Sequence, residues 1–447
     1  MNRKLATAKN IGGTITVPGD KSIAHRTALL SILAGEPIVA VNYPDNLDCR
    51  TSLEAARKFG VGVEQNDNRV TFTPPSQINL PEETIIDCGN SGTTARLLAG
   101  LVAGSELSVI LSGDESLSGR PMKRIIDPLR EMGAVLFDRE GHLPLKIQGK
   151  KLLPFEYRLP VASAQLKSSL MLAALASKCS LTLREDIITR DHTEIMLSQI
   201  GEGLSVREIK PVMTPDPHDP RKKRMAMPED FKKEIKLASH SGVKGGMVDI
   251  PGDISTAAFF MAAAAVSGGT LTINDLGLNP TRTAFIEHLK NIGCRVEISD
   301  KTVQSGEIRG TVTVTGGPLK ARKISSETTA GLIDEIPIVA VMAAFAEGTT
   351  IIRDAAELRV KECDRLAATA TNLQKMGVKC GLLSDGLAIE GGGERNGTDF
   401  ECFGDHRIAM AFSIAALFLD GPSTIDDDSR VAVSCPEFYN LLENIIQ

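Results

Sequence analysis

The apolar positions of this chain recur in one arrangement six times. Each copy begins with a short loop of small and polar residues and continues into an apolar, Ala-rich run of helical length. The run stops at Gly or another small residue, and an alternating, strand-like stretch follows. The six loops are residues 18–22, 88–92, 161–165, 251–255, 332–336 and 403–407. Their spacing of roughly 70–90 residues exceeds that of solenoid repeats, so each copy is expected to contain several strands and more than one helix.

The same pattern predicts individual elements. Helices are expected at residues 23–33, 93–102 and 336–346, and each is followed by a strand, at 37–42, 107–111 and 349–352. Further amphipathic helices closed by Gly are expected between the copies, at residues 52–59, 121–132, 283–292 and 364–376. No G-x-G-x-x-G follows a predicted strand, and no P-loop sequence is present. The pattern therefore predicts an α/β fold of six related units rather than a series of Rossmann units.

One stretch interrupts the repeat. Residues 206–241 are rich in Pro and charge and include the basic run RKKR at 221–224. A charged run of this kind is usually a solvated surface insertion, which is the favoured interpretation, and a regulatory or partner-binding loop is the alternative. Three units precede the stretch and three follow it. We therefore expect two lobes of similar plan, one formed by residues 20–242 and the other by residues 1–19 and 243–447.

Charged residues gather at the starts of the predicted helices. A helix N-terminus presents free backbone N–H groups and a partial positive charge, so it attracts anions. Several such ends with Lys and Arg beside them predict a site for a highly anionic small molecule. The net charge of −6 argues against a nucleic-acid partner bound over a broad basic surface, so the anion site must be local.

The eight cysteines are scattered and include no C-x-x-C pair, which favours neither a zinc site nor a disulfide scaffold. The longest apolar run, residues 257–266, is too short to span a bilayer. The N-terminal residues lack the apolar core of a signal peptide. A reducing cytoplasm is the expected compartment, with no membrane partner.

Six motifs give the chain a resemblance to a known family. Residues 17–26 (VPGDKSIAHR), 89–97 (GNSGTTARL) and 359–366 (RVKECDRL) resemble the principal signatures of the 5-enolpyruvylshikimate-3-phosphate synthase family. Residues 163–165 (SAQ), 190–194 (RDHTE) and 404–407 (GDHR) match this family as well. The SAQ and RDHTE forms are similar to a subgroup that includes many Gram-positive and glyphosate-tolerant bacterial enzymes. The resemblance covers the chain except for residues 206–241.

The resemblance implies a reaction and a fold. The family transfers the enolpyruvyl group of phosphoenolpyruvate to the 5-hydroxyl of shikimate 3-phosphate and releases phosphate, a step in chorismate and aromatic amino acid biosynthesis and the target of glyphosate. The implied fold has two lobes, each with three βαβαββ units about a pseudo-threefold axis, and an active site in the cleft between them. The resemblance implies no cofactor and no metal, and we expect a monomer in the cytoplasm.

The resemblance also assigns the site, residue by residue. Both substrates carry a phosphate and a carboxylate, for which planar, bidentate guanidinium groups are the best partners. Shikimate 3-phosphate is expected to contact Lys21, Ser22, Arg26, Ser163, Ala164, Gln165, Arg190, Asp334 and Lys361. Phosphoenolpyruvate is expected to contact Lys21, Asn90, Gly92, Arg120, Gln165, Arg365, His406 and Arg407. The expected catalytic residues are Asp334, Glu362, Lys21 and His406.

Asp334 resembles the family's base near the 5-hydroxyl, and Glu362 its acid–base group at the enol methylene. Lys21 and His406 are expected to assist at the bridging or phosphate oxygens. Each carboxylate also has a purely structural alternative. An Asp at a helix start is commonly only an N-cap. A Glu between two cations is in some proteins only an ion-paired spacer.

Two positions bear on how closely the chain follows the family. Gly92 keeps the small residue beside the phosphoenolpyruvate site, so glyphosate tolerance through a side chain at that position is not indicated. Val433 stands where many members have a Lys, and Arg430 is the candidate to replace that cation.

Two other functions are compatible with a fold of this kind. The enolpyruvyl transferase that acts on UDP-N-acetylglucosamine typically has Lys-Asn where this chain has Lys21 and Ser22, and it has a reactive Cys in a mobile loop. The corresponding loop here, residues 112–120, contains no Cys. The second alternative is a non-catalytic anion-binding relative that kept the fold. Retention of Asp334 and Glu362 argues against it.

Overall fold

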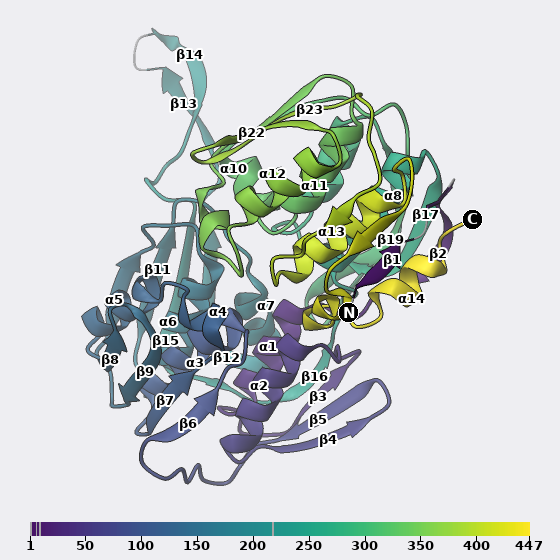
Figure 1. The fold of residues 1–447 in the computed structure, drawn as a ribbon. Coiled ribbons are helices and arrows are strands. Elements are labelled where there is room, and N and C mark those ends of the chain that lie inside the picture. Colours follow the sequence, from purple (N-terminus) through teal and green to yellow (C-terminus); the bar gives the residue numbers. More distant parts are fainter. Residues whose placement is uncertain (1, 6, 9, 217–218) are drawn as a thin grey trace. The chain divides into compact units, whose positions relative to one another are not determined.

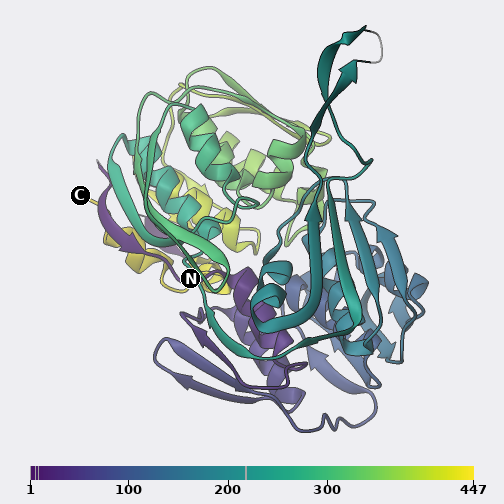
Figure 2. The ribbon, with the colours of Figure 1, turned by 180° about the vertical axis from the view of Figure 1, so that it is seen from behind.

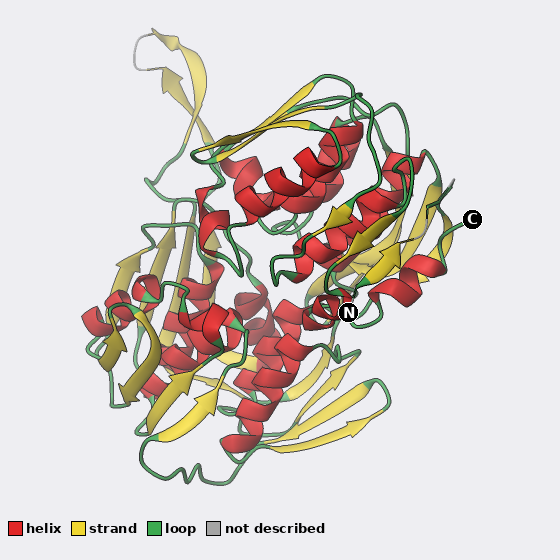
Figure 3. Ribbon diagram, viewed as in Figure 1, coloured by secondary structure: helices red, strands yellow, loops and turns green. Residues whose placement is uncertain are grey.

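The computed structural model describes residues 2–5, 7–8, 10–216 and 219–447. These residues form two compact units (Figures 1 and 2). Unit 1 comprises Met1–Ala24, Val41–Arg50 and Asp249–Gln447, and unit 2 comprises His25–Ala40 and Thr51–Val248. Both units are built from helices and small sheets (Figure 3).

The elements alternate along the chain as the sequence predicts. In unit 2 and at its borders the helices are α1 (Lys21–Leu30), α2 (Leu47–Lys58), α3 (Gly92–Gly104), α4 (Glu115–Ser118), α5 (Lys123–Glu131), α6 (Ala164–Ser177) and α7 (His192–Ile200). The strands there are β3 (Ile38–Val41), β4 (Gly62–Asn66), β5 (Arg69–Thr73), β6 (Thr84–Asp87), β7 (Ser108–Ser112), β8 (Val135–Arg139), β9 (His142–Gln148), β10 (Phe155–Arg158), β11 (Leu181–Glu185), β12 (Gly201–Glu208), β13 (Val212–Asp216), β14 (Asp219–Ala226), β15 (Lys233–Val243) and β16 (Gly246–Asp249).

Unit 1 holds the remaining elements. Its helices are α8 (Ile254–Ser267), α9 (Ala284–Asn291), α10 (Ser326–Leu332), α11 (Ile336–Phe345), η1 (Ala356–Val360), α12 (Arg365–Lys375), α13 (His406–Ala416), η2 (Asp428–Val433) and α14 (Phe438–Glu443). Its strands are β1 (Arg3–Leu5), β2 (Gly12–Thr16), β17 (Thr270–Gly277), β18 (Arg295–Gln304), β19 (Glu307–Thr315), β20 (Lys323–Ile324), β21 (Thr349–Ile352), β22 (Lys379–Leu383), β23 (Gly386–Glu390), β24 (Asp399–Phe400) and β25 (Ser423–Ile425).

Four sheets share one strand order. In the sheet β6-β7-β9-β8, β6 pairs parallel with β7, and β9 pairs antiparallel with both β7 and β8. The sheets β10-β11-β15-β12, β2-β17-β19-β18 and β20-β21-β23-β22 repeat this order and these orientations. Parallel neighbours need a crossover, whereas antiparallel neighbours need only a turn, so each sheet requires a helical connection followed by a hairpin. This is the βαβαββ unit implied by the resemblance.

A strand near the N-terminus completes the sheet of the sixth βαβαββ repeat. In the sheet β1-β25-β24, β24 pairs parallel with β25, and β1 pairs antiparallel with the other edge of β25. The N-terminal strand therefore takes the place of a hairpin strand that the C-terminal repeat lacks. Sequence periodicity could not reveal this pairing, because its two strands lie at opposite ends of the chain.

Small residues allow the first helices of the six βαβαββ repeats to pack closely against one another within each unit. In unit 2, a Cβ added at Gly100 of α3 would lie 1.9 Å from the carbonyl oxygen of Ser169 on α6, and one added at Gly104 would lie 2.1 Å from that of Ala173. The two backbones are therefore in contact, which only glycine permits. The helical pair fixes the positions of the N-termini of α3 and α6.

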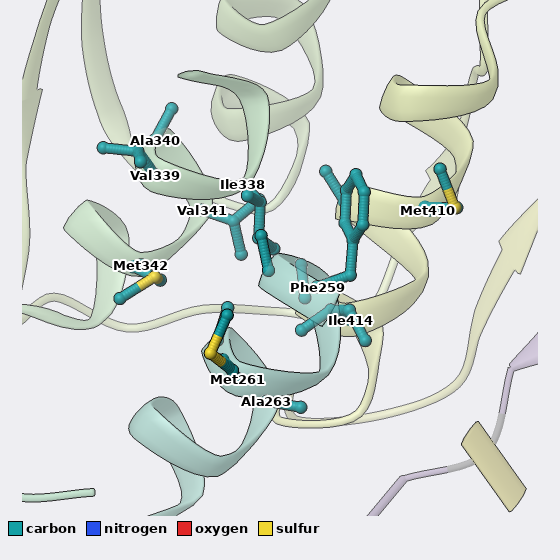
Figure 4. Close-up of a cluster of buried hydrophobic side chains, with 14 of the residues drawn as sticks. Phe259, Met261, Ala263, Ile338, Val339, Ala340, Val341, Met342, Met410 and Ile414 are labelled. Carbon is teal, nitrogen blue, oxygen red and sulfur yellow. The ribbon is translucent and has the colours of Figure 1, made fainter. Parts of the chain in front are cut away.

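In unit 1 the corresponding helices α8, α11 and α13 form the centre of the core (Figure 4). All three are apolar on every side, as expected for helices buried within a domain. Phe259 of α8, Ile338 of α11 and Ile414 of α13 are each at most 1% exposed. Only the polar N-termini of these helices are left to carry chemistry.

The expectation for residues 206–241 is partly wrong. Residues 206–208 belong to β12 and residues 233–241 to β15, and these two strands pair antiparallel in the sheet β10-β11-β15-β12. Ile235 and Leu237 are buried in alternation, a signal that the surrounding charge concealed. Only the part between these strands is inserted, and β13 and β14 form a hairpin there that projects from the sheet (Figures 1 and 2). The side chains of residues 221–224 lie outside what the structure describes.

No single helix of the described residues is both long and apolar enough to cross a membrane. Taken together, α10 and α11 have the length and the apolar composition of a membrane span, but the chain is bent by 108° between them.

Candidate active site

Three of the predicted loops precede helices in unit 1, and each places an Asp at the N-terminus of its helix. Asp20 Oδ1 accepts from Ser22 N at 2.7 Å in the first turn of α1. Asp253 is the N-cap of α8, and Asp405, fully buried, is the N-cap of α13. These carboxylates satisfy N–H groups that would otherwise have no partner. The residues that follow them, among them Lys21 and His406, are thereby fixed at the N-termini.

Lys21 is held by a carboxylate that the sequence did not single out. Its Nζ lies 2.7 Å from Asp48 Oδ2 on α2, and both side chains are largely buried. The charge-assisted pair holds the ammonium group in one position.

Arg365, at the start of α12, gathers the proposed acid–base groups of unit 1. Its Nε donates to Asp405 Oδ2 at 2.7 Å, and its Nη2 donates to Glu362 Oε2 at 2.6 Å. Its Nη1 lies 3.6 Å from Asp334 Oδ1. Burial alone would lower the pKa of this guanidinium, but the three carboxylates outweigh it, and the pKa is raised. The structure thus brings Asp334 and Glu362 to one permanent cation.

Asp334 lies between α10 and α11 and is not the N-cap of α11. That position is occupied by Glu335, whose side chain makes no capping hydrogen bond. Asp334 Oδ1 also lies 3.6 Å from Lys361 Nζ, which in turn lies 3.1 Å from Glu357 Oε1. The two cations, rather than the N-cap position of α11, are thus the contacts that the structure gives Asp334 here.

His406 and Arg407 begin α13. His406 is buried, and among the described residues its Nε2 has no hydrogen-bond partner. Burial first, and then the nearby positive charge of Lys21, holds its pKa well below the usual value, so the imidazole is neutral at physiological pH. Arg407 Nη1 donates to Ser255 Oγ at 2.9 Å and to the backbone oxygen of Asp334 at 2.9 Å.

Unit 2 contains a second cluster, at the N-termini of α3 and α6. Arg120 Nη2 donates to Asn90 Oδ1 at 2.6 Å, and Asn90 Nδ2 donates to Asp114 Oδ2 at 2.7 Å. Gln165, in the first turn of α6, accepts from Arg96 Nη1 at 3.1 Å. Three arginines, Arg96, Arg120 and Arg124, lie beside Gln165 or beside the neighbouring Asn90. Their positive charge favours an anionic ligand.

Two of these cations were not among the residues predicted for the site. Arg96 lies inside the second motif, and Arg124 Nη2 lies 3.4 Å from Gln165 Oε1. Arg124 stands four residues after Arg120, at the start of α5. That spacing at a predicted helix start was the signal available in the sequence.

The other predicted residues of unit 2 lie around α6 and α7. Arg26 is buried; its Nε donates to Thr193 Oγ1 at 2.7 Å and its Nη2 to Ser168 Oγ at 2.9 Å. Ser163 caps α6 through Leu166 N, and Ala164 is the first residue of that helix. Arg190 is partly exposed two residues before the start of α7.

Comparison with known proteins decides the family. The model of the family described as EPSP synthase (3-phosphoshikimate 1-carboxyvinyltransferase) matches residues 5–442. Curated relatives named 3-phosphoshikimate 1-carboxyvinyltransferase are 40% identical in Citrifermentans bemidjiense and 41% identical in Salinibacter ruber, each over 100% of this chain and 99% of the relative. The solved EPSP synthase of Acinetobacter baumannii superposes with a TM-score of 0.81 at 35% identity, over 99% of this chain and 98% of that one. This chain belongs to the EPSP synthase family. The two-lobed fold is the fold of that family.

This member of the EPSP synthase family follows the expected pattern at Gly92 and departs from it at Val433. A Cβ added at Gly92 would lie 2.6 Å from Arg96 Nη1 and 3.5 Å from Arg120 Nη1, so the missing side chain leaves room for two cations. Val433 ends η2, and Arg430 in the same turn is paired with Asp427 at 2.9 Å. This ion pair is partly exposed, and the replacement of the Lys by Arg430 stays a prediction.

Proposed function

We propose that this chain catalyses transfer of the enolpyruvyl group of phosphoenolpyruvate to the 5-hydroxyl of shikimate 3-phosphate, with release of phosphate. The observation that carries the proposal is the position of Arg365, which contacts Glu362 and Asp405 and lies beside Asp334. One guanidinium that can stabilise developing negative charge next to two carboxylates suits a reaction that needs a base, an acid and an anion site.

Shikimate 3-phosphate is assigned to residues of both units. Arg26, Ser163, Ala164, Gln165 and Arg190 belong to unit 2, and they offer a guanidinium pair and the N-terminus of α6 to a phosphate. Lys21, Ser22, Asp334 and Lys361 belong to unit 1. Turnover therefore requires both units.

Phosphoenolpyruvate is likewise assigned to both units. Arg120, Asn90, Gly92 and Gln165 belong to unit 2, and Lys21, Arg365, His406 and Arg407 belong to unit 1. Arg365 Nε and Nη2 donate to Asp405 and Glu362, so Nη1, which lies 3.6 Å from Asp334 Oδ1, is the atom assigned to the substrate. The neutral His406 offers an unused ring nitrogen to a phosphate oxygen.

The reaction proceeds by addition and elimination. Asp334 takes the proton of the 5-hydroxyl while that oxygen forms a bond to C2 of the enolpyruvate, and Glu362 delivers a proton to the methylene carbon. In the second step the bond from C2 to the phosphate oxygen breaks, and the methyl group returns a proton to Glu362. The proton held by Asp334 passes to the departing phosphate oxygen, so phosphate leaves as hydrogen phosphate and both carboxyl groups regain their starting states. Lys21 and His406 stabilise the departing phosphate. Its charge is held by Lys and Arg, so the chain's own residues supply the electrostatic stabilisation that the leaving group needs.

The decisive experiment is phosphate release by the purified chain. Release should require both substrates, and UDP-N-acetylglucosamine should not replace shikimate 3-phosphate. Activity with the nucleotide sugar would favour the related transferase, and binding without turnover would favour a non-catalytic relative. We also propose that the protein is a cytoplasmic monomer, and light scattering of the active preparation would test the monomeric state.

A further inference from the structure

Two loops of unit 1 with the same sequence, Pro-Gly-Asp, pair with each other. Asp20 N donates to Pro251 O at 2.8 Å, and Asp253 N donates to Pro18 O at 2.9 Å. Gly19 and Gly252 form the antiparallel bridge between them. The approach is close, since a Cβ at Gly252 would lie 3.0 Å from Cγ2 and 3.4 Å from the backbone oxygen of Val17, which directly precedes the other loop. The pairing brings the starts of α1 and α8 together.

Both aspartates of these loops cap a helix and face one buried arginine. Arg282, in the loop before α9, is 7% exposed. Its Nη2 lies 3.2 Å from Asp253 Oδ1 and 3.8 Å from Asp20 Oδ2. Its backbone N–H donates to the carbonyl of Asn279 at 2.8 Å, and the amide of Asn279 is fixed by Glu307 at 3.2 Å. A buried cation thus joins the N-caps of two helices.

The residues that follow these caps belong to the proposed site. Lys21 and Ser22 open α1. Ser255, in the first turn of α8, accepts from Arg407 Nη1 at 2.9 Å. Two buried carboxylates would cancel much of the positive potential that anions find at helix ends, and Arg282 offsets one of them.

We propose that Arg282 is a positioning residue that keeps the N-termini of α1 and α8 aligned and able to bind anions. The inference rests on the proposed function, because the anions concerned are shikimate 3-phosphate at Lys21 and Ser22 and phosphoenolpyruvate at Arg407. Arg282 itself touches neither substrate in this assignment. It acts through Asp20 and Asp253.

The charges around the two caps set what happens without Arg282. Burial raises the pKa of Asp253, repulsion by Asp20 raises it further, and Arg282 opposes both effects. Other titratable groups that interact with these residues are Arg407, Asp334, Glu335, Cys49 and Cys435. Removing Arg282 leaves two carboxylates facing each other, and such a pair shares a proton at a higher pH than either carboxylate alone.

The test compares Arg282→Met with Arg309→Met. Arg309 is a matched control, because it is equally buried in unit 1 and pairs with two carboxylates, Asp249 at 2.6 Å and Asp275 at 2.8 Å, that cap no helix. Calorimetric titration with shikimate 3-phosphate and the KM for phosphoenolpyruvate are measured for both variants. For Arg282→Met we expect each to weaken roughly tenfold, the order of effect of one unit charge about 12 Å away at an effective dielectric constant of about 20. Arg309→Met should change thermal stability but not affinity.

The pH dependence separates this role from a merely structural one. The affinity of Arg282→Met is divided by that of the unmodified protein at each pH, which removes the titration of the ligand phosphate. The ratio should rise towards one as pH falls, because protonation of the Asp20–Asp253 pair restores the lost balance of charge. Arg282→Lys should recover most of the affinity and give a flat ratio. If Arg282→Met does not fold, Arg282→Gln, which is neutral but can still hydrogen-bond, gives the same comparison.

Unchanged affinity in folded Arg282→Met or Arg282→Gln would overturn the inference, as would an equal loss in Arg309→Met or a ratio independent of pH. Failure of the proposed function is distinguishable, because the unmodified protein would then neither bind shikimate 3-phosphate nor release phosphate.

Discussion

Glu362 Oε2 lies 2.6 Å from Nη2 of Arg365, three residues later in the chain, and the same guanidinium donates through Nε to the buried Asp405. The cation is thus held by Asp405 whether or not Glu362 is charged. Glu362 can change its protonation state during turnover without releasing Arg365 from its place.

Glu362→Gln therefore tests chemistry apart from architecture. The amide keeps the shape of the side chain and removes its charge, so kcat should fall about 10²-fold or more, the usual scale for a general acid–base group. Affinity for shikimate 3-phosphate in titration should stay within a few-fold. Glu357→Gln is the control, since Glu357 is also paired with a cation, Lys361 at 3.1 Å, but has no assigned chemical role. Equal loss of kcat in both variants would make Glu362 a structural ion-pair partner.

Arg26 and Arg120 should separate the two substrates. Arg26→Ala should chiefly weaken shikimate 3-phosphate and Arg120→Ala chiefly phosphoenolpyruvate, because loss of one charge-assisted hydrogen bond costs about 1.5–3 kcal/mol. Arg26→Lys should recover part of the loss by keeping the charge. The dissociation constant for shikimate 3-phosphate and the KM for phosphoenolpyruvate measure the two effects. Equal effects of each variant on both ligands would show that the assignment is wrong.

Gly92→Ala should weaken phosphoenolpyruvate through the two arginines. The new methyl group would lie 2.6 Å from Arg96 Nη1, so Arg96 must move away from Gln165, which it holds at 3.1 Å. The KM for phosphoenolpyruvate should rise severalfold, and affinity for shikimate 3-phosphate should change less. Gly119→Ala is the control, because a Cβ there meets its nearest atoms only at 3.6 Å, and Gly119 directly precedes Arg120. A matching rise in KM for Gly119→Ala would count against the steric explanation.

Local pattern predicted most of the helices well. The sequence predicts helices at 336–346 and 364–376, and the structure has them at Ile336–Phe345 and Arg365–Lys375. The first helix is Ala-rich and the second is amphipathic, and a Gly follows shortly after the end of each. Residues close by in the sequence therefore determine where these helices begin and end. The strand at Thr349–Ile352 was likewise predicted to the residue.

Pairing between distant segments was not predictable. The strand β15 was assigned to a surface insertion because charged residues alternate with Ile235 and Leu237, and Lys233 is itself buried against Asp191 at 3.2 Å. Such a buried charge is recognisable only when its partner is known. The same holds for Asp48 beside Lys21.

Acid should destabilise unit 1 through His288. Burial, and then the positive charge of Arg322, lowers the pKa of His288 to about 4. The unfolded chain takes up the proton near pH 6.5 and the folded chain only near pH 4, so stability is lost as pH falls through this window. Between pH 7.5 and 4.5 the loss from this group is about 2 kcal/mol. In urea unfolding at the two pH values, His288→Asn should lose less stability than the unmodified protein, and an equal loss would exclude the effect.

Asp334 is the strictest test of the acid–base assignment, because Glu335 holds the N-cap position of α11 and Asp334 Oδ1 lies 3.6 Å from both Lys361 Nζ and Arg365 Nη1. Asp334→Ala should therefore lower kcat about 10²-fold or more, as expected for loss of a general base, with little loss of thermal stability. Asp427→Ala is the matched control, since Asp427 caps η2 through Ser429 N and pairs with Arg430. That variant should lose about 1 kcal/mol of stability and keep its turnover per folded molecule. Measuring kcat and Tm together distinguishes the two roles, because a destabilised but fully active Asp334→Ala would remove Asp334 from the catalytic residues.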